Sequence, residues 1–168
     1  MTNNEIVQKL WNLCNVLRDD GITYHEYVTE LTYILFLRIA NELGTEDKIG
    51  IPEEYRWEEL AKLDGTDLRN KYQEALLRLG KNSSTLGTIY RNAQTRIAEP
   101  ANLKKIFTEI NKIEWYSEDK ENLGDLYEGL LEKNASEKKS GAGQYFTPRV
   151  LIDSMLRIIK PELGERIC

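Results

Sequence analysis

Residues 23–43 read TYHEYVTELTYILFLRIANEL and contain the longest unbroken apolar run of the chain, Ile34 to Leu37. The stretch opens with Thr23-x-x-Glu26, the spacing of a capping box, in which two side chains bind the free backbone N–H groups of a helix start. Its other large apolar residues recur at helical spacing and widen into a broad stripe. A helix that is apolar on most of its circumference is normally buried. We therefore predict that residues from about 23 to 43 form the central helix of a bundle.

Helical spacing recurs along the chain and predicts further helices around this one. A second capping box, Thr2-x-x-Glu5, opens a helix that should stop near Gly21. Pro100 stands as the first-turn proline of another helix. The remaining predicted helices cover residues 67–79, 123–131 and 152–159. The sequence therefore predicts a mainly α fold.

Two stretches carry weaker patterns. Residues 45–64 combine Pro52 with clustered glutamates, which predicts a surface connection with at most a short helix at Trp57–Leu60. Residues 82–99 remain ambiguous between helix and other structure. We expect the first of these stretches to stay on the surface.

The composition is ordinary for a soluble globular protein. The chain has 168 residues, of which 40% are hydrophobic and 30% charged, enough for one domain or one domain plus part of a second. Its net charge of −5 argues against the whole chain being an electrostatic sleeve for nucleic acid. No signal peptide or membrane-length apolar run is present, and Cys14 and Cys168 have no disulfide or ligand spacing. These features predict a cytoplasmic protein without a metal site, in which His25 is a solvated helix-start residue.

Residues 141–149 read GAGQYFTPR, a glycine-hinged loop that runs into a helix start. Thr147 stands where an N-cap belongs and Pro148 where the first helical residue belongs. Such a loop ends on free, positively polarised amides, which suit a carboxylate or a phosphate. The alternative is a plain flexible linker, with Tyr145 and Phe146 packed on the core.

The end of the sequence predicts a change of fold. Residues 133–140 form a polar stretch that we interpret as a domain boundary or connector. Beyond the loop, the helix over 152–159 closes at Pro161 and Gly164, and Arg166 begins what reads as the start of a strand. Helix, turn and strand in this order are typical of an α/β domain. We expect the chain to be part of a longer protein.

Two segments carry a family resemblance. The loop Gly-x-Gly-Gln-Tyr-Phe-Thr-Pro-Arg at residues 141–149 is preceded by Asn-Leu-Gly-Asp-Leu-Tyr-Glu at residues 122–128. Together they resemble the modification (methyltransferase) subunit of type I restriction-modification systems, and the leading helices are similar to the helical domain that begins those subunits. The resemblance spans essentially the whole chain. It implies a helical bundle at residues 1–140 leading into a truncated α/β S-adenosylmethionine-dependent methyltransferase domain at residues 141–168.

The resemblance implies an adenine-specific N6 DNA methyltransferase that uses S-adenosyl-L-methionine and flips its target base. It also implies a specificity subunit, a second methyltransferase subunit, a restriction subunit and DNA as partners. The segment that lies against the cofactor in this family corresponds here to Gln144, Tyr145, Phe146, Thr147, Pro148 and Arg149.

The sequence departs from the complete family pattern in one respect. The four prolines, Pro52, Pro100, Pro148 and Pro161, are all isolated, so the chain has no Asn-Pro-Pro-aromatic or Asp-Pro-Pro-aromatic motif. Methyl transfer to an exocyclic amine needs a polar side chain and a backbone carbonyl to hold that amine, and an aromatic to stack on the base. We therefore predict no catalytic residue within this chain and no activity from it alone.

Two further hypotheses concern binding. Lys133, Lys138 and Lys139 concentrate positive charge near the loop and are candidates for contacts to the DNA backbone, although a solvated linker explains them equally well. A second basic cluster comprises Arg91, Arg96, Lys104 and Lys105. The alternative to an enzyme part is a non-enzymatic helical protein-interaction module, whose function would lie on the exposed helix faces.

Overall fold

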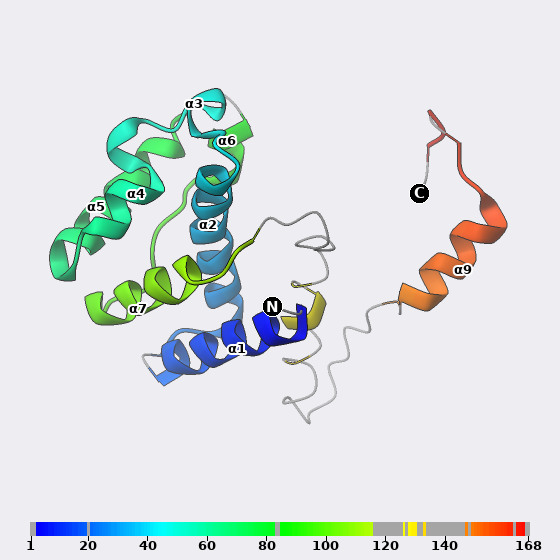
Figure 1. Ribbon diagram of the computed structural model, residues 1–168, viewed down its shortest axis with the longest axis horizontal. Coiled ribbons are helices and arrows are strands. Elements are labelled where there is room, and N and C mark those ends of the chain that lie inside the picture. Colours follow the sequence, from blue (N-terminus) through cyan, green and yellow to red (C-terminus); the bar gives the residue numbers. More distant parts are fainter. Residues whose placement is uncertain are drawn as a thin grey trace. The chain divides into compact units, whose positions relative to one another are not determined.

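The computed structural model describes residues 3–19, 21–82, 85–115, 126, 128–130, 133, 147, 149–162 and 164–166. The chain divides into two compact units, residues 1–134 and residues 135–168. Within the described ranges every regular element is a helix, and Figure 1 shows them along the chain. The prediction of a mainly α fold is confirmed.

Helix α2, Tyr24–Glu42, is the central element of the first unit, as predicted. Both halves of its capping box form, because the Thr23 Oγ1 accepts from the Glu26 amide at 3.3 Å and the Glu26 carboxylate accepts from the Thr23 amide at 2.9 Å. Helices α1, α3, α4 and α7 all contact α2. Figure 1 shows α4 and α5 on one side of α2.

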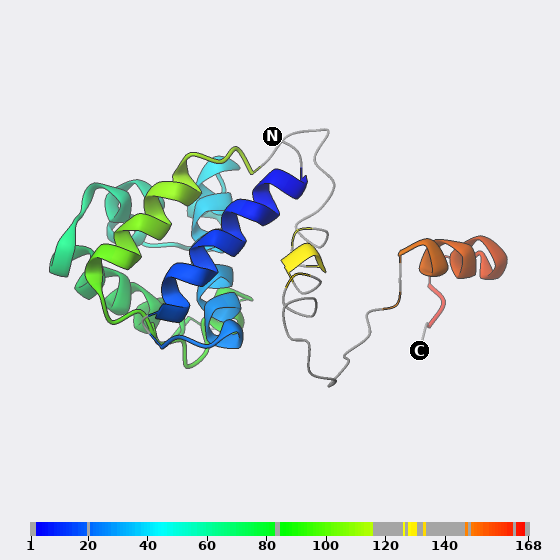
Figure 2. The ribbon, with the colours of Figure 1, turned by 90° about the horizontal axis from the view of Figure 1, so that it is seen from below.

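Helix α1, Asn3–Asp19, packs on α2 through an apolar face that includes Leu10 and Cys14. Cys14 is buried and belongs to the apolar core. Helix α7, Pro100–Asn111, starts at the proline that marked it in the sequence. Figure 2 shows α7 and α1 side by side.

The prediction of a surface connection over residues 45–64 is wrong, although the short helix predicted at Trp57–Leu60 does form. The stretch forms three short helices, α3 (Glu46–Ile49), η1 (Glu53–Tyr55) and α4 (Trp57–Lys62), and Trp57 is completely buried. The Trp57 ring stacks on Phe107 of α7 at a centroid distance of 4.8 Å, and its Nε1 donates to the Asn111 Oδ1 at 2.8 Å. The clustered glutamates of this stretch are exposed. They give a clear sequence signal for the solvent-facing side of these short helices, whereas the buried side has no equally clear signal.

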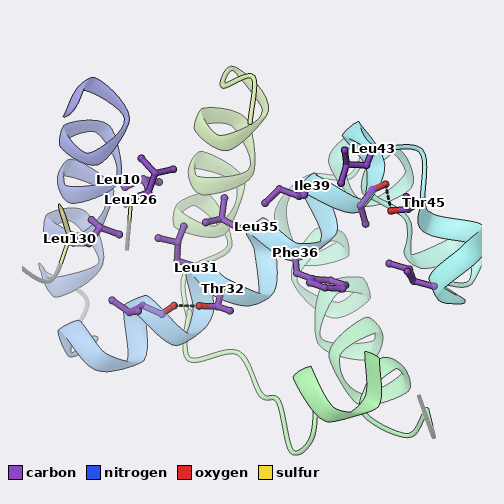
Figure 3. A pocket seen from close by; sticks show the side chains of 13 residues that line it. Leu10, Leu31, Thr32, Leu35, Phe36, Ile39, Leu43, Thr45, Leu126 and Leu130 are labelled. Atoms are coloured by element: carbon purple, nitrogen blue, oxygen red, sulfur yellow. Dashed lines mark hydrogen bonds between the residues drawn. The ribbon is translucent and has the colours of Figure 1, made fainter. Parts of the chain in front are cut away.

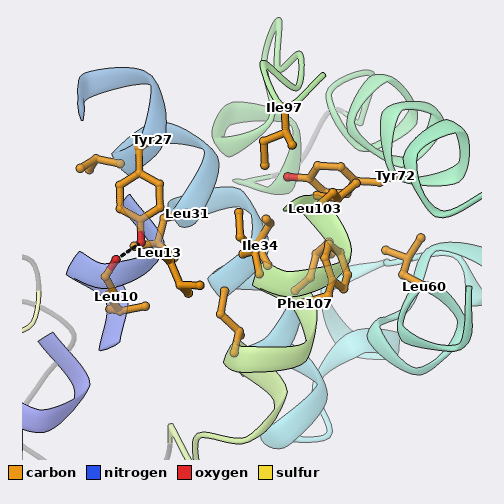
Figure 4. Close-up of a cluster of buried hydrophobic side chains, with 14 of the residues drawn as sticks. Leu10, Leu13, Tyr27, Leu31, Ile34, Leu60, Tyr72, Ile97, Leu103 and Phe107 are labelled. Atoms are coloured by element: carbon orange, nitrogen blue, oxygen red, sulfur yellow. Dashed lines mark hydrogen bonds between the residues drawn. The ribbon is translucent and has the colours of Figure 1, made fainter. Parts of the chain in front are cut away.

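Helix α5, Gly65–Leu79, completes the core by packing on α7. Its Tyr72 meets Phe107 edge to face, at a centroid distance of 5.6 Å. A short helix, α6 (Thr85–Ile89), follows, and residues 93–99 then cross the unit without regular structure. Figure 4 shows how side chains from α1, α2, α5 and α7, together with Ile97 of this crossing segment, meet in one cluster.

Beyond residue 115 the described part of the first unit is a short piece of helix at residues 126, 128–130 and 133. Gly129 on this piece lies so close to α1 that a β-carbon there would sit 2.8 Å from the Val7 Cγ2. In the second unit, helix α9 spans Arg149–Ile159 and ends before Lys160, which adopts a left-handed φ of 47°. The helix predicted over residues 152–159 is confirmed.

Candidate functional site

The segment predicted to line a cofactor is described at two of its six positions. Thr147 is exposed, and Arg149 is the first residue of α9. The other four positions, Gln144, Tyr145, Phe146 and Pro148, lie outside the described residues. The role assigned to this segment therefore stays a prediction.

Helix α9 is unusual for the number of large apolar side chains it exposes. Six of its residues present such side chains to solvent: Val150, Leu151, Met155, Leu156, Ile158 and Ile159. A helix in a finished domain normally buries a stripe of this kind against another element.

The predicted DNA-contacting lysines are described only at Lys133. Its Nζ donates to the Gln8 Oε1 of α1, so this lysine ties its helix to the first helix of the unit. Lys138 and Lys139 lie outside the described residues. Contact between these lysines and DNA stays a prediction.

Of the second basic cluster, Lys104 is engaged inside the protein, whereas Arg91, Arg96 and Lys105 are exposed. The Lys104 Nζ donates to the Ala61 carbonyl at 3.0 Å and to the Leu63 carbonyl at 2.6 Å, which closes the carboxyl end of α4. Arg96 lies 3.8 Å from the Glu26 carboxylate. Lys104 in particular has a structural partner and is not a free cation for phosphate contact.

A polar hollow of about 210 Å³ lies beside the start of α2. Its lining residues are His25, Glu26, Thr29, Glu30, Tyr33, Asn92, Gln94 and Arg96. Glu30 has an exposed fraction of 2%, and among the described residues it is the one charged residue that is buried. One carboxylate oxygen accepts from the Arg96 amide at 3.0 Å, which fastens the crossing segment to α2.

Burial raises the pKa of the Glu30 carboxyl, and the Arg96 amide opposes that rise, followed by the Tyr72 and Thr95 side chains. The second carboxylate oxygen and the Tyr72 hydroxyl are both buried without a partner at normal hydrogen-bond geometry. Because no nucleophile and base are paired here, we assign Glu30 a role in holding the fold.

A large apolar depression, which we call the α2 groove, runs along the other side of α2 (Figure 3). It has a volume of about 580 Å³. It is lined by Leu10, Val28, Leu31, Thr32, Leu35, Phe36, Ile39, Ala40, Leu43, Thr45, Ile49, Leu126 and Leu130. The broad apolar stripe on residues 23–43 predicts a buried helix but does not by itself reveal the groove.

Two common kinds of site find no support in the described ranges. No three His, Cys, Asp or Glu side chains there gather in a group that could hold a metal ion. Among the helices of those ranges, none has the length and apolar character needed to cross a bilayer.

Comparison with known proteins gives two family matches in order along the chain. Residues 6–110 match the HsdM N-terminal domain, and residues 118–168 match the N-6 DNA Methylase family. The chain is 42% identical over 170 residues to the StySPI methylase subunit of a type I restriction enzyme from Salmonella potsdam. It is 41% identical over 170 residues to the EcoKI methylase subunit from Escherichia coli K12. Each alignment covers 98% of this chain and 32% of the relative, so the chain spans about a third of their length.

Solved structures agree with these matches. The crystal structure of the EcoKI M protein superposes with a TM-score of 0.61 and 30% identity, covering 94% of this chain and 27% of that one. A structure from work on assembly and conformational transition of a type I R-M system gives a TM-score of 0.67. It is 24% identical, covers 98% of this chain and 37% of that one, and so supports the fold alone. The resemblance seen in the sequence is confirmed, and the chain belongs to the family of the HsdM N-terminal domain.

Proposed function

We propose that this chain is the amino-terminal part of a type I restriction-modification methylase subunit. The full-length subunit would transfer a methyl group from S-adenosylmethionine to N6 of adenine in DNA. It would act with a specificity subunit, a second methylase subunit and a restriction subunit. In this proposal the helical unit contributes contacts to subunits and DNA, and the segment before α9 contributes one wall of the cofactor pocket.

One observation carries the proposal. The HsdM N-terminal domain match over residues 6–110 is followed directly by the N-6 DNA Methylase match over residues 118–168. The exposed apolar face of α9 supports it, because helices that flank an α/β sheet bury such a face against the sheet. The absence of a catalytic Pro-Pro motif from this sequence leads us to expect that the 168-residue chain alone does not methylate DNA.

The described part of the cofactor segment fits a carboxylate-bearing ligand. Thr147 is exposed two residues before the start of α9, whose first backbone N–H groups have no acceptor within the helix. A hydroxyl and free amides at a helix start suit the carboxylate of S-adenosylmethionine, which supplies the methyl group when bound. The remaining proposed wall residues are Gln144, Tyr145, Phe146, Pro148 and Arg149.

Calorimetry of S-adenosylmethionine binding to the full-length subunit tests the cofactor wall. We expect Thr147→Ala and Phe146→Ala each to weaken binding at least tenfold, about the loss of one good hydrogen bond or apolar contact. Thr108→Ala is the control, since that hydroxyl is exposed and bonds within α7. Unchanged affinity in both test variants would make the segment a structural hinge.

Methyl transfer tests the activity itself. The full-length subunit with its specificity subunit should label DNA containing the recognised site, and the labelled product should be N6-methyladenine. A different methylated base would contradict the adenine assignment. Labelling by the 168-residue chain alone would contradict the expectation that it lacks the catalytic equipment.

A further inference from the structure

The α2 groove is lined by apolar side chains and only two hydroxyls, those of Thr32 and Thr45. Its two hydroxyls are both engaged, because the Thr32 Oγ1 donates to the Val28 carbonyl at 2.8 Å and the Thr45 Oγ1 donates to the Ala40 carbonyl at 3.3 Å (Figure 3). Small-molecule sites combine an apolar lining with a few well-placed polar groups that fix the ligand. A groove of about 580 Å³ without such groups suits apolar side chains of a protein instead.

The groove also leaves large side chains unburied within its own unit. Leu43, at the carboxyl end of α2, keeps an exposed fraction of 43%. Leu35, Phe36 and Ile39 are half-buried along the same side of the helix. Contiguous apolar surface of this kind marks a site that another protein surface covers.

One wall of the groove already belongs to the methylase region. Leu126 and Leu130 fall within residues 118–168, which match the N-6 DNA Methylase family, whereas the walls from α1 and α2 fall within the HsdM N-terminal domain match. Gly129, between the two leucines, permits the close approach to Val7 that seats this piece of helix on α1. The two family regions are therefore already in contact at one side of the groove. The unfilled part of the groove extends from this contact across α2.

We propose that the α2 groove is the seat for the remainder of the methylase domain of the same subunit. This inference rests on the proposed function, because it takes the chain to be part of a longer methylase. Apolar side chains of that domain would fill the groove beside Leu35, Ile39 and Leu43, and would hold the helical unit as a rigid extension of the catalytic domain. A second copy of the chain fits less well, since the groove continues a contact that the methylase region already makes with α1 between Gly129 and Val7.

Amide hydrogen exchange compares the full-length subunit with the 168-residue chain. We expect exchange over residues 31–43 to be at least about tenfold slower in the full-length subunit, because docking suppresses local opening of α2. In the full-length subunit, Leu43→Glu should abolish this slowing, since it places a charge in an apolar contact. Equal exchange in the two wild-type proteins would overturn the proposal.

Leu77→Glu is the matched control. Leu77 lies on α5, away from the groove, and its exposed fraction of 50% is close to that of Leu43. In the 168-residue chain, both variants should unfold at the same temperature as the wild type, which shows that neither damages the helical unit. Loss of slowing in both full-length variants, or in neither, would contradict docking in the groove.

Two outcomes distinguish this inference from dimer formation and from the proposed methylation activity. If the slowing depends on protein concentration and follows dimer formation in the ultracentrifuge, a second copy fills the groove and the proposal is wrong. Methyl transfer is measured on the same wild-type preparation. Slowed exchange without methylation would contradict the proposed activity but support the docking. Methylation without slowed exchange would contradict the docking but support the proposed activity.

Discussion

The Tyr27 hydroxyl donates a hydrogen bond of 2.6 Å to the Leu10 carbonyl oxygen, in the buried contact between α1 and α2 (Figure 4). Leu10 belongs to α1, so this bond attaches the first helix to the central one from within the core. Burial raises the pKa of Tyr27 well above its ordinary value, and the hydroxyl therefore remains a donor throughout the physiological range. The pair is a polar anchor in an otherwise apolar interface.

Tyr27→Phe should lower the free energy of unfolding by about 1 kcal/mol, the usual net value of one buried hydrogen bond. The ring stays in place, so the apolar contact between the helices is kept. Urea unfolding of the 168-residue chain measures the loss. Tyr33→Phe is the control, because the Tyr33 hydroxyl makes no hydrogen bond to the described residues, and this variant should stay within about 0.5 kcal/mol of the wild type. A similar loss in both variants would mean that the hydrogen bond to the Leu10 carbonyl does not add to the stability of the chain.

Glu30→Gln should change how stability depends on pH. Burial raises the folded-state pKa of Glu30 above its ordinary value of 4.5. A raised pKa gives a stabilisation that is complete below the unfolded-state pKa and is lost as the pH rises through the folded-state pKa. The free energy of unfolding of the wild type should therefore fall, relative to Glu30→Gln, as the pH rises from about 4 to 7.5.

The glutamine keeps an oxygen that can accept from the Arg96 amide, so the two proteins should be most alike at the acidic end of the series. Glu30→Ala removes that acceptor and should lose about 1–3 kcal/mol at every pH, because a buried amide is left unsatisfied. A difference between wild type and Glu30→Gln that does not vary with pH would show that Glu30 keeps the same charge over the whole range.

The helices that the sequence predicted well are those with local signals. Each of these signals acts within one or two helical turns, so it can be recognised in the sequence before the fold is known. The signals are the capping box at Thr23 and Glu26, the proline at the start of α7, and the helical spacing of α5 and α9. Of the short helices at residues 46–62, only the one at Trp57–Leu60 was predicted from the sequence, and its burial was not. The burial of Trp57 depends on Phe107 and Asn111, which lie far along the chain, and no local pattern announces partners at that distance.

The candidate site divides in the same way. Residues 141–149 were singled out because loop chemistry and a family resemblance coincide there, yet their role depends on geometry that the described residues do not test. Glu30 occupies an ordinary polar position on α2 and becomes buried because the crossing segment at Arg96 covers it. The α2 groove arises from the arrangement of four elements, so no single stretch of sequence could reveal it.

Lys104→Met should lower the free energy of unfolding by about 2 kcal/mol, because its ammonium group satisfies two carbonyls at the end of α4 and methionine keeps only the apolar stem. It should leave the DNA affinity of the assembled enzyme unchanged. Lys105→Met, on the exposed side of the same helix, should alter stability by less than about 0.5 kcal/mol. Weaker DNA binding by Lys104→Met at unchanged stability would show that the ammonium group contacts phosphate after all.

Changing Lys133, Lys138 and Lys139 together to glutamine should reduce the salt dependence of DNA binding in the assembled enzyme. Each lost phosphate contact reduces the slope of log affinity against log salt by about 0.9. The control changes three exposed lysines elsewhere on the helical unit to glutamine: Lys9, Lys48 and Lys81. Since both triple variants lose the same charge, an equal change of slope would indicate a general charge effect, and no change in the first would remove the lysines from the DNA interface.

Gly129→Ala should loosen the seat of the second family region on α1. The new β-carbon would lie 2.8 Å from the Val7 Cγ2 and 3.3 Å from its Cγ1, and a β-branched side chain has little freedom to move aside. Overpacking of this kind destabilises by about 1–3 kcal/mol, whereas alanine in place of glycine favours the helix by about 1 kcal/mol. We expect a net loss of up to about 2 kcal/mol in urea unfolding.

Val7→Ala in the same chain removes both methyl groups that the new β-carbon would meet. The double variant Val7→Ala/Gly129→Ala should therefore be more stable than the sum of the two single changes predicts, by at least about 1 kcal/mol. Additive losses would place the strain of Gly129→Ala somewhere other than the contact with α1. They would also weaken the argument that the groove extends an interface already formed between Gly129 and Val7.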